Sequence, residues 1–240
     1  RRNTVDPTDI IEAYGADTAR LFMLSDSPPE RDMEWTEAGV DGAWRYLNRL
    51  WRLFEERAPV PAPAGTPAPA EPSAPARELR RTVHRTIDAV TGELERFHFN
   101  KAVALVRELS NAIEAFPAAD GGADPAAPAL LREALEALVL LLGPMTPHLG
   151  EELWRKLGHD DLLADAPWPK ADPAWLAADQ VTLAVQVNGR LRGTIELPVG
   201  SPREVAEAAA LGEPRVTREL AGRPPRRVIV VPDKIVNVVV

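Results

Sequence analysis

Apolar side chains recur every three or four residues through most of the first 157 positions, a spacing that predicts amphipathic helices. The predicted helices cover residues 7–14, 17–24, 37–57, 77–97, 100–116, 129–142 and 147–157. In the third helix the stripe expected to be buried consists of Val40, Trp44, Leu47, Trp51 and Phe54. The short connections between these helices favour an antiparallel bundle.

Two of these helices also carry arginine-rich faces. Arg45, Arg49 and Arg52 lie on a second face of helix 37–57. Helix 77–97 is expected to bury Leu79, Val83, Ile87, Val90 and Leu94 and to expose Arg77, Arg80, Arg81, His84 and Arg85. Such stripes have two interpretations: a solvated face with partners four residues away, or a surface that contacts phosphate groups.

A proline-rich segment separates the first helices from the rest of the bundle. Seven of the nineteen residues in 58–76 are proline, and most of the others are alanine. Because proline lacks a backbone donor and fixes φ, this segment is expected to form an extended spacer. The predicted organisation is therefore residues 1–57 leading into the bundle, a linker or insertion at 58–76, and the bundle at 77–170.

The last quarter of the chain changes to the alternating period of β-strands. Apolar residues alternate through 181–187, Asn188-Gly189 is a strong two-residue hairpin signal, and Leu191, Ile195 and Leu197 alternate on the return. Ser201 and Glu204 have the spacing of a capping box that opens a helix ending near Gly212. A second helix after Pro214 and strands at 226–231 and 235–240 complete the pattern. The predicted fold class is mainly α, a helical bundle followed by a small α/β domain at 177–240.

The strand-rich tail also carries basic residues. Arg190 and Arg192 are two residues apart and are expected to share the outward face beyond the tight turn, with Lys234 in the opposite turn. This pattern is consistent with a binding edge. It is equally consistent with an edge strand that is protected from aggregation by its charges.

The charge is unevenly distributed. The net charge is −8, but residues 177–240 contain 9 basic and 7 acidic side chains, whereas residues 1–176 contain 19 and 29. Since a nucleic acid responds to charge within about 10 Å, the acidic total weakens a polyanion-binding role without removing it. The chain has no cysteine, no secretory signal and no apolar run of membrane-spanning length, so we expect a cytoplasmic protein without a membrane role.

No set of residues in the sequence forms a recognisable catalytic or metal site. The four histidines lack metal-ligand spacing, and His148 in the sequence P-H-L-G-E-E has no second histidine one turn later. The adjacent Glu151 and Glu152 point about 100° apart on a helix, and no phosphate-binding glycine loop is present. We therefore predict no catalytic residue and no metal ligand.

Several segments together resemble the C-terminal part of bacterial leucyl-tRNA synthetases, which are class I enzymes. The opening R-R-N with D-P-T-D-I-I-E-A-Y-G-A-D-T-A-R-L (residues 6–21) is similar to the segment directly after the Lys-Met-Ser-Lys-Ser loop of that family. E-W-T-E-A-G-V-D-G-A-W-R-Y-L-N-R-L-W (34–51) and P-M-T-P-H-L-G-E-E-L-W (144–154) resemble helices of its anticodon-binding bundle. V-Q-V-N-G-R-L-R-G (185–193) and V-P-D-K-I-V-N-V-V-V (231–240) resemble its C-terminal domain.

The resemblance implies a fragment that positions tRNA(Leu) and is itself inactive. The loop that contacts ATP would end just before Arg1, so ATP, Mg²⁺, the catalytic domain and the editing domain would belong to the rest of the parent chain, and the fragment would be monomeric. The residues expected to contact tRNA are Asn188, Gly189, Arg190, Arg192, Lys234, Asn237, Arg45, Arg49, Arg52, Arg81 and Arg85. The alternative is a helical protein-interaction module without an RNA role, whose binding would resist salt.

Overall fold

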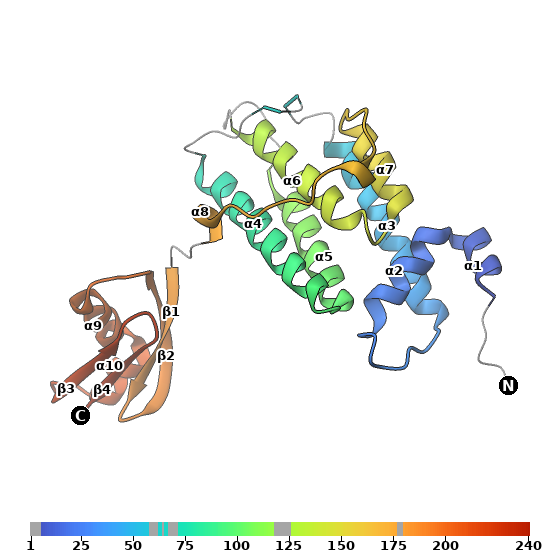
Figure 1. The fold of residues 1–240 in the computed structure, drawn as a ribbon. Coiled ribbons are helices and arrows are strands. Elements are labelled where there is room, and N and C mark those ends of the chain that lie inside the picture. The colour runs from blue at the N-terminus through green and yellow to red at the C-terminus, as the bar shows by residue number, and fades with distance from the viewer. Residues whose placement is uncertain (1–5, 58–61, 64, 67–71, 118–125, 177–179) are drawn as a thin grey trace. The chain divides into compact units, whose positions relative to one another are not determined.

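The protein consists of two compact units, which are described separately. A computed structural model describes residues 6–57, 62–63, 65–66, 72–117, 126–176 and 180–240. Its contacts divide the chain into Arg1–Leu176, here called the helical unit, and Ala177–Val240, here called the C-terminal unit. Figure 1 shows the helices of the first and the sheet of the second. The predicted fold class, a helical bundle followed by a small α/β domain, is confirmed.

The helical unit contains each predicted helix, with ends within three residues of the prediction. The helices are α1 (Pro7–Tyr14), α2 (Ala16–Asp26), α3 (Glu37–Arg57), α4 (Ala74–Glu95), α5 (Phe99–Ala115), α6 (Ala127–Leu142) and α7 (Pro147–Lys156). A 3₁₀ turn, Leu163–Asp165, and the short helix α8 (Pro173–Leu176) follow. Local signals explain several boundaries: Asp6 accepts a hydrogen bond from the Thr8 N–H, and the Thr36 hydroxyl accepts one from the Gly39 N–H.

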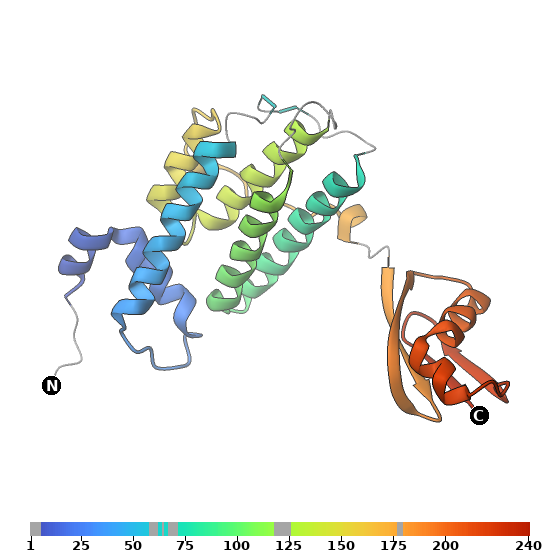
Figure 2. The same ribbon diagram turned by 180° about the vertical axis from the view of Figure 1, so that it is seen from behind.

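Helix α6 lies at the centre of the helical core. Leu131, Leu135, Leu138 and Leu142 are at most 1% exposed, because apolar residues surround this helix on nearly every side. Helices α4 and α5 pack beside it, as both ribbon views show (Figures 1 and 2). All five residues predicted to be buried from residues 100–116, Val103, Val106, Leu109, Ile113 and Phe116, are buried.

The buried stripe of α3 differs from the prediction at both tryptophans. Trp44 and Trp51 remain 42% and 38% exposed, whereas Ala43 and Leu50, each one position earlier, are buried. One residue corresponds to about 100° around a helix, so a 3–4 spacing fits two neighbouring stripes. The core selects the stripe that also contains Tyr46 and leaves the indole rings at its margin.

Helix α4 begins three residues earlier than predicted, inside the proline-rich segment. The Ser73 hydroxyl accepts a hydrogen bond from the Ala76 N–H, and Pro75 is tolerated because the first turn does not need its missing donor. The helix ends at Glu95, so Phe97, predicted to be helical, lies outside it with φ of +59°. Of the remaining linker only residues 62–63, 65–66 and 72–73 are described, and Ala62 donates to the Pro128 carbonyl at 3.1 Å.

Two residues predicted to be exposed on α4 are instead part of an internal polar network. His84 is 6% exposed, and its Nε2 lies 3.1 Å from Glu133 Oε1 of α6. The Asp172 N–H donates to His84 Nδ1 at 3.2 Å, and Arg80 also pairs with Glu133 at 2.9 Å. The prediction was wrong for His84, and Arg80 is only partly exposed, because the irregular segment before α8 folds back over this face of α4.

The C-terminal unit is a four-stranded sheet with two helices. Its elements are β1 (Gln180–Val187), β2 (Arg190–Pro198), α9 (Arg203–Gly212), α10 (Pro214–Leu220), β3 (Arg227–Val231) and β4 (Ile235–Val239). The strand order is β2-β1-β4-β3, with β1 and β4 parallel and both outer pairs antiparallel. Alternate β1 residues Leu183, Val185 and Val187 are buried with Ala206, Ala210 and Val216 of the helices, as the period of two predicts.

The hairpin forms at Asn188-Gly189 as predicted, but the return strand contains a bulge. Asn188 and Gly189 have φ of +49° and +78°, the left-handed values that an Asn-Gly turn of this length requires. Val185 pairs with Gly193 while Gln186 pairs with Leu191, so Arg192 is an extra residue on β2. The predicted capping box does not form, because the Ser201 hydroxyl donates to the Pro198 carbonyl instead.

Within the described residues, no helix has both the length and the apolar composition that crossing a bilayer requires.

Candidate nucleic-acid interface

One end of the C-terminal unit collects residues from all four strands. Since β1 and β4 are parallel, β1 ends where β4 ends, and their antiparallel partners β2 and β3 begin there. This places Arg190, the first residue of β2, at the same end of the sheet as Arg226 and Arg227 at the start of β3. We call these three exposed arginines, together with the Asn188-Gly189 turn, the basic end.

The predicted contact residues Asn188, Gly189 and Asn237 are brought together and bonded to the sheet. Asn237 Oδ1 accepts a hydrogen bond from the Gly189 N–H at 3.0 Å, and Asn188 Oδ1 accepts one from the Val240 N–H at 3.1 Å. Both side-chain oxygens therefore hold the turn against β4. This fastening fixes the turn in place beside the arginines of the basic end.

Arg192 does not share the outward face of Arg190, contrary to the sequence-based expectation. The bulge turns its side chain toward α10, where the guanidinium makes a bidentate pair with Glu219. The hydrogen bond from Arg192 lowers the pKa of Glu219 and raises that of Arg192. Leu191 is left 61% exposed. In this structure Arg192 holds the strand to the helix.

Lys234 lies at the opposite end of the sheet from the basic end. It precedes β4, next to Asp233, whose carboxylate accepts a hydrogen bond from the Gly200 N–H beyond β2. The five residues of β4 separate the two ends by about 17 Å. Lys234 and Arg190 thus cannot contact the same phosphate group.

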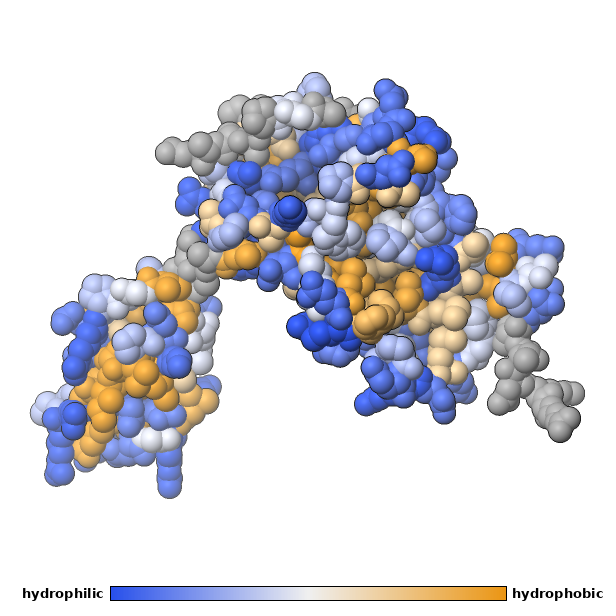
Figure 3. Space-filling view, in the orientation of Figure 1, coloured by the Kyte–Doolittle hydropathy of each residue, from blue (hydrophilic) through white to orange (hydrophobic). Residues whose placement is uncertain are grey.

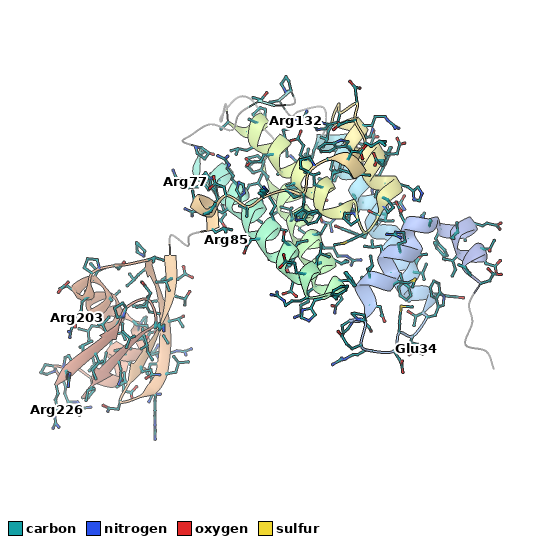
Figure 4. All side chains as sticks on the ribbon, viewed as in Figure 1. Glu34, Arg77, Arg85, Arg132, Arg203 and Arg226 are labelled. Atoms are coloured by element: carbon teal, nitrogen blue, oxygen red, sulfur yellow. The ribbon has the colours of Figure 1, made fainter. Side chains whose placement is uncertain are left out.

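The sequence contained a signal for the basic end that the sequence-based prediction did not use. The run R-P-P-R-R at 223–227 places arginines on both sides of two prolines, just before β3. Figure 4 labels Arg226, which projects from the unit near the end of the chain, and Figure 3 shows hydrophilic side chains there beside an apolar band on the visible face. Only the pairing of β3 with β4 shows that these arginines lie at the same end of the sheet as Arg190, at the opposite outer strand.

The arginines predicted on α3 have different surroundings. Arg49 pairs with Glu114 of α5, and this hydrogen bond is the main cause that lowers the pKa of Glu114. Arg45 lies 3.6 Å from Asp41 one turn earlier, with both side chains largely in solvent. Arg52 is exposed and adds to the positive charge around Glu114. The α3 stripe is therefore a basic surface that α5 partly neutralises.

The α4 arginines of the predicted site, Arg81 and Arg85, are one turn apart. Arg81 is half-buried, whereas Arg85 is exposed and projects from the helix (Figure 4). They belong to the helical unit and form no common site with the α3 stripe, which lies on another helix. Within the helical unit, the predicted residues therefore lie on two helices, α3 and α4.

Acidic and histidine side chains of the described residues do not gather into a metal-binding group. No group of three or more histidine, aspartate or glutamate side chains in this part of the chain is placed to hold a metal ion. His159, for example, bonds Glu136 and stacks on Trp154 with ring centroids 3.5 Å apart, so it is part of an internal contact between side chains.

Comparisons with known proteins show what the chain is similar to. Residues 76–207 match the family described as the anticodon-binding domain of tRNA ligase. The whole chain is 58% identical to a leucine–tRNA ligase of Paramagnetospirillum magneticum and 55% identical to one of Rhodospirillum rubrum, covering 27% of each. The chain thus spans about a quarter of the length of these curated relatives and corresponds to a C-terminal part of them.

A solved structure shows the same fold over nearly the whole chain. It is the LeuRS of Agrobacterium radiobacter K84, crystallised in a ternary complex with tRNA and LeuAMS. The TM-score is 0.82 at 32% identity, and the match covers 99% of this chain and 30% of that one. The family match also extends beyond the helical unit, through β1, β2 and the first turn of α9.

Proposed function

Because the chain belongs to the family of anticodon-binding domains of tRNA ligases, we propose that it is the tRNA-binding part of a leucine–tRNA ligase, with tRNA(Leu) as its partner. The observation that carries this proposal is the match of all 240 residues to leucine–tRNA ligases. The alternative of a helical protein-interaction module without an RNA role is not favoured, because the chain matches tRNA ligases. Since tRNA is aminoacylated in the compartment where it is used for translation, we place the protein in the cytoplasm. We also propose that it is a monomer.

The physical role we assign to this part is binding energy and orientation. Arginine offers charge and up to five donors to phosphate oxygens, and the three arginines of the basic end are exposed at one end of the sheet, at its two outer strands. The Asn188-Gly189 turn lets a backbone or a base approach closely between them. Holding the RNA in a fixed orientation lowers the entropic cost of bringing its reactive end to an active site.

In this proposal, the aminoacylation reaction takes place in the part of the parent protein that corresponds to the remaining three quarters of its relatives' length, which this chain does not span. We assign leucine activation, with its ATP and Mg²⁺, to that part, together with catalytic and editing domains. The residues described here bind and orient only. The chain alone is therefore expected to bind tRNA without aminoacylating it.

A fluorescence titration with a tRNA(Leu) transcript and a non-cognate tRNA, at 50 mM and 200 mM salt, tests this proposal. Binding of a polyanion through several arginines should weaken steeply with salt, with a slope near −0.9 per phosphate contact. Arg226→Gln should weaken binding by roughly three- to tenfold and reduce that slope by about 1, whereas Arg215→Gln on α10 serves as a matched loss of charge. If neither tRNA binds at 50 mM salt, the proposal is wrong.

A further inference from the structure

A hollow of about 360 Å³ between α3 and α5 joins arginines that are far apart in the sequence. Arg45 and Arg49 line it from α3, four residues apart, and Arg107 and Asn111 line it from α5 with the same spacing. Residues four apart lie on the same face of a helix, so two polar pairs face each other across the hollow. Tyr46 completes the lining. The two helices lie side by side in Figure 2.

Arg107 stands out because nothing in the described part of the chain neutralises it. Its guanidinium carbon lies 4.6 Å from the centre of the Tyr46 ring, and no carboxylate of the described residues pairs with it. Its Nε is buried and has no hydrogen-bond partner there. More than nine in ten buried polar groups in proteins have a partner, so this unpaired donor is unusual. With no carboxylate of the described residues beside it, Arg107 is the arginine of this lining whose charge is available to a bound anion.

The lining is held in place by contacts between the two helices. The Tyr46 hydroxyl donates to the Ser110 hydroxyl at 3.3 Å, and that hydroxyl in turn donates to the Arg107 carbonyl at 2.7 Å. Burial raises the pKa of Tyr46 to about 12, so its hydroxyl stays protonated and the nearby charge remains positive. A preorganised set of donors loses little entropy when an anion binds.

We propose that this hollow binds a phosphodiester group of the tRNA backbone, through Arg107, Arg45 and the Asn111 amide, with Arg49 shared between the phosphate and Glu114. The inference rests on the proposed function, because it assumes that the polyanion is the bound tRNA. The chemistry favours phosphate, because guanidinium groups match two of its oxygens at once and an amide supplies a further donor. Free inorganic phosphate offers the same oxygens, and the experiment separates the two sources.

The test compares variants of the whole chain in the tRNA titration. Arg107→Gln should weaken tRNA binding by roughly three- to tenfold and reduce the salt slope by about 1. Asn111→Asp, an exposed position that tolerates the change, should weaken binding as well, because its carboxylate repels the phosphate. Glu114→Gln should strengthen binding, because it frees Arg49. The matched control is Arg155→Gln on α7, an exposed arginine paired with Glu152, which should bind as the wild type does.

The outcomes distinguish this inference from the proposed function. If the wild-type chain binds tRNA and both Arg107→Gln and Asn111→Asp bind equally well, the phosphate site is wrong and the proposed function stands. If the wild-type chain binds no tRNA, both fall. A titration with inorganic phosphate tests the other source. If Arg107→Gln abolishes the binding of phosphate and leaves the affinity for tRNA unchanged, the hollow is a site for a free anion and the proposal is overturned.

Discussion

The substitution Asp17→Ala tests whether a single carboxylate of α2 stabilises the turn between α6 and α7. Asp17 is 8% exposed, and its Oδ2 accepts a hydrogen bond from the Leu149 N–H at 2.7 Å while His148 Nδ1 lies 2.9 Å from Oδ1. Both partners are in the first turn of α7, whose preceding residue, Thr146, provides no side-chain cap. Asp17 therefore does from another helix what a capping residue does locally.

The opposite charge on α2 acts on the other side of the same turn. Arg20 donates to the carbonyls of Met145 and Pro144, at 3.2 and 2.8 Å, just beyond the C-terminus of α6. A cation at a helix C-terminus and an anion at a helix N-terminus are each stabilising. One turn of α2 thus holds both α6 and α7 in place.

The expected cost of Asp17→Ala is about 2 kcal/mol. Loss of an N-cap costs about 0.5–2 kcal/mol, and a hydrogen bond to a charged group contributes about 1.5–3 kcal/mol. The His148 contact adds little, because that side chain is 77% exposed. For a unit of this size, about 2 kcal/mol corresponds to a fall in Tm of roughly 4–8 °C.

The assay is thermal unfolding followed by tryptophan fluorescence. All six tryptophans, at positions 35, 44, 51, 154, 168 and 175, lie in the helical unit, so the signal reports on that unit alone. The control is Asp26→Ala, an exposed aspartate at the C-terminal end of the same helix, which should leave Tm unchanged or slightly raised. A Tm for Asp17→Ala within 1 °C of wild type would refute the reasoning.

Two further predictions concern the C-terminal unit. Gly193→Ala should destabilise it by about 1–3 kcal/mol, because a Cβ there would lie 2.7 Å from the Glu213 carboxylate that caps α10. The control is Gly212→Ala, which has open space around its Cβ and should leave the stability unchanged. Urea unfolding followed by amide NMR signals measures both. Arg192 holds the folded-state pKa of Glu219 below its ordinary value, so the pair contributes stability above about pH 5 that is lost as pH falls below about 4. Glu219→Gln should therefore flatten the acid limb of the stability curve, and an unchanged limb would contradict this linkage.

The candidate site shows where prediction from sequence stops. Asn188 and Gly189 could be selected from the hairpin signal and Asn237 from the family resemblance, and the structure brings the three together at one end of the sheet. The side of the sheet toward which the Arg192 side chain points could not be predicted. It is set by a bulge, which depends on the pairing of β1 with β2 and has no signature in β2 alone. Arg107 was missed because it lies on α5, 58 residues beyond Arg49, and only packing brings the two to one hollow.

The sequence by itself determined the order and the kind of the elements. Periods of 3.6 and 2, proline and glycine at the boundaries, and the Asn-Gly turn are local properties, so the strands and the longer helices could be located within a few residues. The short helix α8 and the 3₁₀ turn before it were not predicted. Tertiary structure decided which of two neighbouring stripes on α3 is buried, that His84 turns inward to Glu133, and which arginines gather into the basic end and the hollow. These outcomes depend on which surfaces pack against one another. The packing energy depends on both partners, so it cannot be read from one segment alone.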